Sequence, residues 1–170
     1  MASKNHKNNE LKSPTFETSL QSIHSILIPF QIAESFISQN HKRVIVQISF
    51  QNTSVQFHAA LQKRKDLFFV MFSKKYQKQL GIFPSDYFQI QLLEDTSKYG
   101  VEMPEELEAV LQSDLEASSI FESFTAGKKR SLIYYVLQFK NSQTRIDKSL
   151  IITENLKLGI RDQKVLIKKV

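Results

Sequence analysis

The chain has 170 residues, a formal net charge of +6 and 41% hydrophobic residues, a composition typical of one ordinary soluble domain or two small ones. It contains no cysteine, which excludes disulfide frameworks and thiolate metal sites. No apolar run approaches the roughly 18 residues of a transmembrane helix, so no membrane span is expected. The polar N-terminus lacks the apolar stretch of a signal peptide, and we therefore expect a cytoplasmic location.

The pattern of apolar residues changes early in the chain. Residues 1–13 show no periodicity and predict a disordered tail. Residues 14–100 contain short runs of alternating apolar residues, typical of strands, and two short stretches at helical spacing, QIAESFISQ and KKYQKQLG. Ser73 is a suitable N-cap for the second stretch, and Gly81 suits its left-handed end. We therefore predict a domain of about six strands with two short helices.

An internal repeat is the most informative feature of residues 14–100. A shift of 44 residues lays one strand–helix–strand unit on another, so that Ile26 falls on Val70, Val46 on Ile90, and Phe36 on Leu80. Neither unit can bury its apolar face alone, whereas two units that face each other can. The repeat predicts a pseudo-symmetric barrel formed within one chain. The alternative is a chance similarity of two strand–helix–strand patterns.

Helical patterns begin after Gly100. Pro104 suits the first position of a helix, Ser113–Glu116 form a capping-box pattern, and Thr125 is a candidate cap for a third helix. Residues 141–142 interrupt that helix, and a fourth helix follows. These signals predict a module of three to four helices over residues 101–158. Residues 159–170 form a basic C-terminal tail, which we expect to be either frayed or a late strand.

Charge is distributed unevenly over this second part. Residues 102–122 contain seven acidic residues and no basic ones, whereas residues 128–170 contain eleven basic and three acidic ones. Neighbouring helices that pair opposite faces would explain the asymmetry. A basic patch for anions or nucleic acid is the alternative. The acidic residues of 102–108 point in several directions around a helix and are expected on a solvated face.

Several short motifs of residues 15–158 occur in an informative order. They are PEEL at Pro104–Leu107, three basic residues at Lys128–Arg130, Tyr134 and Tyr135, Lys140, and the pair Thr144 and Arg145. Their order and spacing resemble the bacterial YdeI/OmpD-associated family. Gln143 stands where that family usually has an acidic residue. Residues 146–148 stand where a further arginine pair is usual.

The resemblance implies a fold and a loose function. Residues 14–100 resemble the domain that often precedes the helical module, which implies a double-split β-barrel like those of AbrB-, MazE- and MraZ-like proteins. The segment SKKYQKQLGIFPSDYFQIQLL is similar to the strand–helix–turn–strand unit of AbrB-like DNA binders, with Ser85 where glycine is usual. The expected fold class is thus mainly β plus α: a barrel followed by a helical module. The implied function is a connection with bacteriocin or antimicrobial-peptide resistance, without defined chemistry.

No catalytic constellation is apparent in the residues. The four histidines, at positions 6, 24, 41 and 58, lack the spacing of metal ligands. The four glycines form no phosphate-binding loop, and no serine lies in a nucleophile elbow. We therefore expect no enzyme, no cofactor and no metal site.

The candidate binding residues are basic. Lys128, Lys129 and Arg130 lie near a helix start, where the macrodipole disfavours cations, so either the acidic helices or a bound anion should compensate them. Arg145 can bond to a carboxylate or to carbonyls at the end of the preceding helix, or it can join the anion site. Lys63, Arg64 and Lys65 are expected in a hairpin loop, solvated or touching nucleic-acid phosphates. Phe68 and Phe69 beside them are expected in the core rather than as stacking platforms.

Three functions remain open from the sequence. The first is a non-enzymatic interaction protein of the YdeI/OmpD-associated type, whose unknown partner would be a protein or peptide. The second, less favoured, is a nucleic-acid binder with an AbrB-like barrel. The third is an enzyme that acts on an anionic substrate. We expect a monomer or a weak homodimer.

Overall fold

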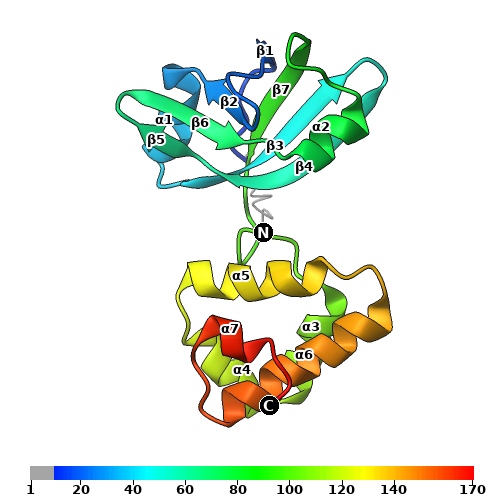
Figure 1. Cartoon of the computed structure of the whole chain (residues 1–170). Helices are drawn as coiled ribbons and strands as arrows, with labels where there is room; N and C mark the ends of the chain where they lie inside the picture. Colours follow the sequence, from blue (N-terminus) through cyan, green and yellow to red (C-terminus); the bar gives the residue numbers. More distant parts are fainter. Residues whose placement is uncertain (1–9) are drawn as a thin grey trace, which may run out of the picture. The chain divides into compact units, whose positions relative to one another are not determined.

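The computed structural model describes residues 10–170 and divides the chain into two compact units, one up to Thr96 and one from Ser97 to Val170 (Figure 1). We call them unit 1 and unit 2. No helix among the described residues has both the length and the apolar character needed to cross a membrane.

Unit 1 consists of two antiparallel sheets and two short helices (Figure 1). The four-stranded sheet has the order β1-β7-β3-β4 and the three-stranded sheet the order β2-β6-β5. The helices, α1 (Phe30–Ile37) and α2 (Lys74–Leu80), each follow a strand of the smaller sheet. The strands are β1 (Phe16–Ser19), β2 (Ser25–Ile28), β3 (Arg43–Phe50), β4 (Thr53–Ala60), β5 (Gln62–Arg64), β6 (Leu67–Met71) and β7 (Tyr87–Glu94).

The two sheets do not close into the predicted barrel, and the strands described number seven rather than about six. The additional strand is β5, in a segment that the sequence predicted to be a loop. Lys65 adopts a left-handed conformation with φ of 53°, which lets the chain turn back so that Arg64 pairs with Leu67. β5 thus extends the smaller sheet through β6 and forms no ladder with the larger one.

The predicted internal repeat is confirmed by the strand register. A shift of 44 residues carries β3 (43–50) onto β7 (87–94), and these two strands pair with Gln47 opposite Gln91. β2 and β6 pair with Ile26 opposite Val70, which is the same separation of 44 residues. In an antiparallel pair related by a twofold axis, the two residues facing each other at the axis must be equivalent. Both sheets meet this condition, as a pseudo-symmetric repeat requires.

The apolar core of unit 1 lies where the repeat predicts it. Ile26, Val46 and Ile90 are fully buried, and the ring of Phe72 stacks on that of Phe57 at 5.8 Å between centroids. Gly81 ends α2 with φ of 72°, as predicted.

The predicted disordered tail is wrong for residues 10–13, and residues 1–9 lie outside the described part. The backbone N–H of Glu94 donates to the carbonyl of Leu11 at 2.7 Å, and that of Ser13 donates to the carbonyl of Leu92 at 2.9 Å. Ser13 is 5% exposed. These contacts use backbone groups, so a polar sequence can extend the ladder of β7 without any apolar alternation.

Unit 2 contains five helices in place of the predicted three to four. Four begin with a side chain that caps a backbone N–H: Asp114 before α4, where the sequence favoured Ser113, Thr125 before α5, Asn141 before α6, and Asp162 before α7. A separate apolar core includes Leu107, Phe121 and Ile152. The helices are α3 (Glu105–Ser113), α4 (Leu115–Glu122), α5 (Ala126–Leu137), α6 (Ser142–Lys157) and α7 (Gln163–Leu166).

The predicted C-terminal tail is neither frayed nor a strand. It forms α7, shown in red beside α6 in Figure 1, and its Leu166 is fully buried. The Asn155 side chain, 3% exposed, donates to the carbonyls of Leu166 and Lys168 at 2.9 and 2.8 Å. Because a buried amide needs hydrogen-bond partners, Asn155 holds the last residues on the core of unit 2.

Candidate functional site

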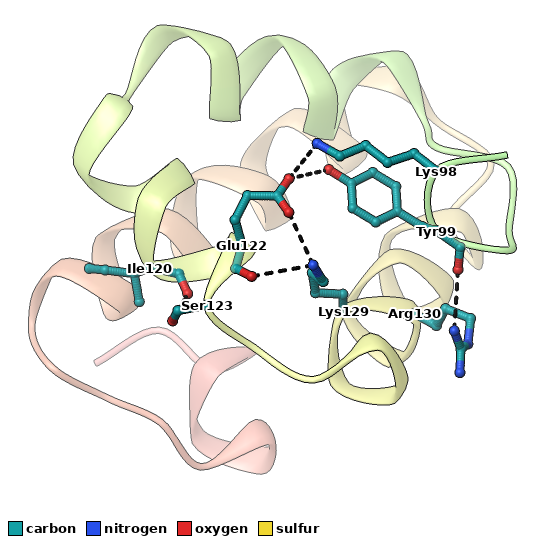
Figure 2. Close-up of polar contacts among 7 residues, drawn as sticks. All are labelled: Lys98, Tyr99, Ile120, Glu122, Ser123, Lys129 and Arg130. Carbon is teal, nitrogen blue, oxygen red and sulfur yellow. Dashed lines mark hydrogen bonds and ion pairs between the residues drawn. The ribbon is translucent and has the colours of Figure 1, made fainter.

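Three basic side chains at the start of α5 find acceptors within unit 2, and Figure 2 shows two of them, Lys129 and Arg130. Lys129 Nζ lies 3.0 Å from Glu122 Oε2 and 3.3 Å from the Glu122 carbonyl. Arg130 donates to the carbonyl of Tyr99 at 3.4 Å. Lys128 donates to the carbonyl of Arg161, with its Nζ 3.9 Å from the centroid of the Phe124 ring.

Glu122 is the centre of this cluster (Figure 2). Its Oε1 accepts hydrogen bonds from Lys98 Nζ at 2.7 Å and from the Tyr99 hydroxyl at 2.5 Å. The hydrogen bonds from Lys98 and Tyr99, followed by that from Lys129, lower the pKa of Glu122 to about 2. Burial, followed by the hydrogen bond to Glu122, raises the pKa of Tyr99.

This cluster explains how α5 accommodates cations at its start. The acidic residue at the end of α4 compensates Lys129, as the pairing of oppositely charged helices predicts, and carbonyl groups take donors of Lys128 and Arg130. The three side chains are half-buried and turned toward their own unit. An anion site at residues 128–130 stays a prediction.

Arg145 makes both contacts that were predicted for it. It lies in the first turn of α6, where its Nε donates to the carbonyl of Phe139 at 2.7 Å. A terminal nitrogen of its guanidinium lies 3.6 Å from Glu106 Oε2, on α3. Arg145 therefore links α6 to α3. It contacts Phe139 and Glu106, which do not belong to the Glu122 cluster.

Glu106 is the residue that sequence analysis missed. The expectation of a solvated acidic face is wrong here, because Glu106 is only 7% exposed. Its pKa is lowered, first by its own backbone N–H group and then by the Ser142 side chain, with a smaller effect from Arg145. Within the described part of the chain, Oε2 accepts no hydrogen bond. The only sequence feature that could have indicated the burial of Glu106 is its position in PEEL, one helical turn before Val110 and on the same face of the helix.

Glu106 lines an open groove of about 490 Å³ between α3 and the start of α6. Ala109, Val110 and Ile146 supply an apolar surface, and Ser142 lies at the α6 side. The other lining residues are Glu105 and Ser113. A mostly apolar groove with one buried carboxylate has the character of a binding site.

The basic residues of unit 1 lie over aromatic rings. Lys63 and Arg64 lie on β5 and Lys65 in the following turn, and all three are exposed. Lys63 Nζ is 5.4 Å from the Phe68 ring centroid, and the Arg64 guanidinium carbon is 5.0 Å from that of Phe69. Phe68 and Phe69 are 4% and 8% exposed, which confirms that they are core residues. The nucleic-acid role of the three cations stays a prediction.

Two histidines of unit 1 have carboxylate partners. His58 Nδ1 lies 2.8 Å from Asp95 Oδ2, and His41 lies 3.7 Å from Glu94. Among residues 10–170, no three His, Asp or Glu side chains meet in a geometry that could hold a metal ion. His6 lies outside the described residues.

We predict that Glu122→Gln makes the stability of unit 2 less dependent on acid. The folded state holds the pKa of Glu122 near 2, below the ordinary value of 4.5. Its contribution is therefore complete above about pH 4.5 and is lost as the pH falls toward 2. At neutral pH the variant should lose about 1 kcal/mol, because a carboxylate one-third exposed is partly screened by water.

Urea unfolding of both chains at several pH values measures this difference. Glu116→Gln, at an exposed position of α4, is the control and should follow the native chain. An equal loss for Glu122→Gln at pH 2 and pH 7 would contradict the prediction.

We predict that Arg145→Leu destabilises unit 2 and that adding Glu106→Gln restores part of the loss. Without Arg145 the buried Glu106 carboxylate keeps its charge but loses its cation, which is unfavourable in the interior. A neutral amide needs no cation. Melting curves should show a decrease of several degrees for the single variant and a smaller one for the double variant. Lys140→Leu, at an exposed position, is the control. A double variant no more stable than Arg145→Leu would contradict the coupling.

Comparison with known proteins finds a family model that matches part of unit 2. Residues 100–159 match the model described as "Bacteriocin-protection, YdeI or OmpD-Associated". The matched segment contains Glu122, Lys129 and both walls of the groove, whereas Lys98 and Tyr99 precede it. No curated protein and no solved structure matches the chain significantly. The resemblance carried by PEEL and the basic motifs is thereby confirmed for residues 100–159, which are similar to the YdeI/OmpD-associated family.

Proposed function

We propose that this chain is a non-enzymatic interaction protein that takes part in protection against bacteriocins, and that the α3–α6 groove is its contact surface. The observation that carries the proposal is the position of the groove: both of its walls lie within residues 100–159, which match the bacteriocin-protection family. We further propose that it acts in the cytoplasm as a monomer or weak homodimer, with a protein or peptide as its partner.

The chemistry of the groove supports binding rather than catalysis. Ser142 is a hydroxyl of the groove that interacts with Glu106, and Glu106 would have to serve as the base that activates it. The lowered pKa of Glu106 makes this carboxylate a weak base. Arg145 is bonded to the Phe139 carbonyl, which fixes it as a structural group.

We predict that Ala109→Arg abolishes protection. Ala109 is exposed and lines the groove, so the arginine fills the groove without disturbing the core. The measurement is survival of bacteria exposed to a bacteriocin, with and without the expressed chain. Ser119→Arg, at an exposed position of α4, is the control and should protect like the native chain. Full protection by Ala109→Arg would overturn the groove as contact surface.

A nucleic-acid binder is the second candidate, and the exposed cations at residues 63–65 favour it. The twofold repeat of unit 1 supports its interpretation as a double-split β-barrel of the AbrB-like kind, in which one chain supplies both halves. In this case the β5–β6 hairpin would contact nucleic-acid phosphates. The third candidate function, an enzyme that acts on an anionic substrate, is not favoured by a comparable observation in the described residues.

We predict for this second candidate that DNA binding weakens steeply with salt. Replacing residues 63–65 by alanine should reduce the slope of log affinity against log salt by about 3, since each phosphate contact contributes about 0.9. Alanine at Lys74, Lys75 and Lys78, also exposed cations of unit 1, is the control of equal charge. Gel shifts at low and high salt measure the slope. No retention of DNA or RNA at low salt would remove this candidate.

A further inference from the structure

We propose that the α3–α6 groove takes a peptide segment in which lysine or arginine alternates with apolar residues, and that Glu106 recognises the cation. This inference rests on the proposed function and names the chemistry of the partner. It follows from three properties of the groove: an incompletely bonded carboxylate, a local excess of negative charge and an apolar floor of sufficient length.

The first property is the incomplete bonding of Glu106. A buried carboxylate normally accepts hydrogen bonds at both oxygens, but Oε2 accepts none within the described residues. Arg145 lies 3.6 Å away, too far for a hydrogen bond. The last torsion of a glutamate is broad, so the carboxylate can turn this oxygen toward the groove that it lines. An ammonium or guanidinium donor would supply the hydrogen bond.

The second property is the sign of the charge. Glu105 and Glu106 both line the groove, whereas Arg145 is the cation that contacts Glu106. Its Nε is already bonded to the carbonyl of Phe139. Two carboxylates against one guanidinium leave the groove negative, which favours a cation over the anion considered from the sequence.

The third property is the length of the groove, part of which is apolar. The lining residues of α3 run from Glu105 to Ser113, which corresponds to about 12 Å at 1.5 Å per residue. A single amine would occupy only the Glu106 end. A segment with apolar residues on either side of its cation would also cover Ala109, Val110 and Ile146. The groove therefore fits a peptide better than a free amine.

Binding of a short capped peptide of alternating leucine and lysine to the full chain tests the inference. Calorimetry should show binding to the native chain, with affinity about tenfold to a hundredfold lower for Glu106→Gln, as expected when a charge-assisted hydrogen bond is lost. Glu108→Gln removes the same charge from an exposed position of α3 and should bind like the native chain. The peptide with glutamine for lysine, and butylamine alone, should bind at least about tenfold more weakly.

Several results would overturn the inference: no binding of the lysine peptide, equal binding by Glu106→Gln, equal binding of the glutamine peptide, or butylamine binding as tightly. Ala109→Arg separates these failures from a failure of the proposed function. If it blocks a peptide that Glu106→Gln still binds, the groove is a contact surface and only the recognition of a cation is wrong. If it has no effect on peptide binding, the groove is not the contact surface and both proposals fail. Circular dichroism of each variant verifies that it folds.

Discussion

Unit 2 depends on the pairing of an acidic half with a basic half. Its first two helices carry acidic residues, and its later helices carry most of the basic ones. Three ion pairs join the halves: Glu122 with Lys129 at 3.0 Å, Asp114 with Lys157 at 2.8 Å, and Glu106 with Arg145 at 3.6 Å. The pKa values of the three acids are all lowered, first by Lys98 for Glu122, by the Ala117 backbone N–H for Asp114 and by its own backbone N–H for Glu106, and then with smaller effects from these cations. Since each pair joins different helices, charge and apolar burial favour the same packing.

The three pairs differ in how completely they satisfy the acid. Glu122 receives three side-chain donors, and Asp114 both caps α4 and contacts Lys157. Glu106 is the most buried of the three acids and yet has the longest ion pair. Burial makes an incomplete set of hydrogen bonds more costly. A site that stays incompletely bonded in the folded state is therefore a natural place for a ligand to add a donor, which is why the groove rather than the Glu122 cluster carries our proposals.

Sequence patterns predicted the features that depend on side-chain periodicity. The repeat was visible because β3 and β7 place apolar residues at every second position, and Thr125 was a visible cap for the start of α5. Features that depend on backbone pairing or on one distant partner were not visible. Residues 10–13 join β7 mainly through their backbone groups, and α7 is held by the distant Asn155 amide together with the burial of Leu166. The burial of Glu106 follows from the packing of α3 against α6, which no local pattern of charged residues reveals.

The two clusters of three basic residues show why composition alone could not locate a site. Lys128–Arg130 follow an acidic helix, and the structure gives these side chains carboxylate or carbonyl acceptors. Lys63–Lys65 lie on a hairpin, where Lys63 and Arg64 cover the rings of Phe68 and Phe69 and remain exposed. Cation–π contacts leave the positive charge in place. The available positive charge of these two clusters thus lies mainly in unit 1, while the groove of unit 2 is negative. An anionic partner that is attracted to residues 63–65 of unit 1 would therefore be repelled by the groove of unit 2, and a cationic partner of the groove would be repelled by residues 63–65.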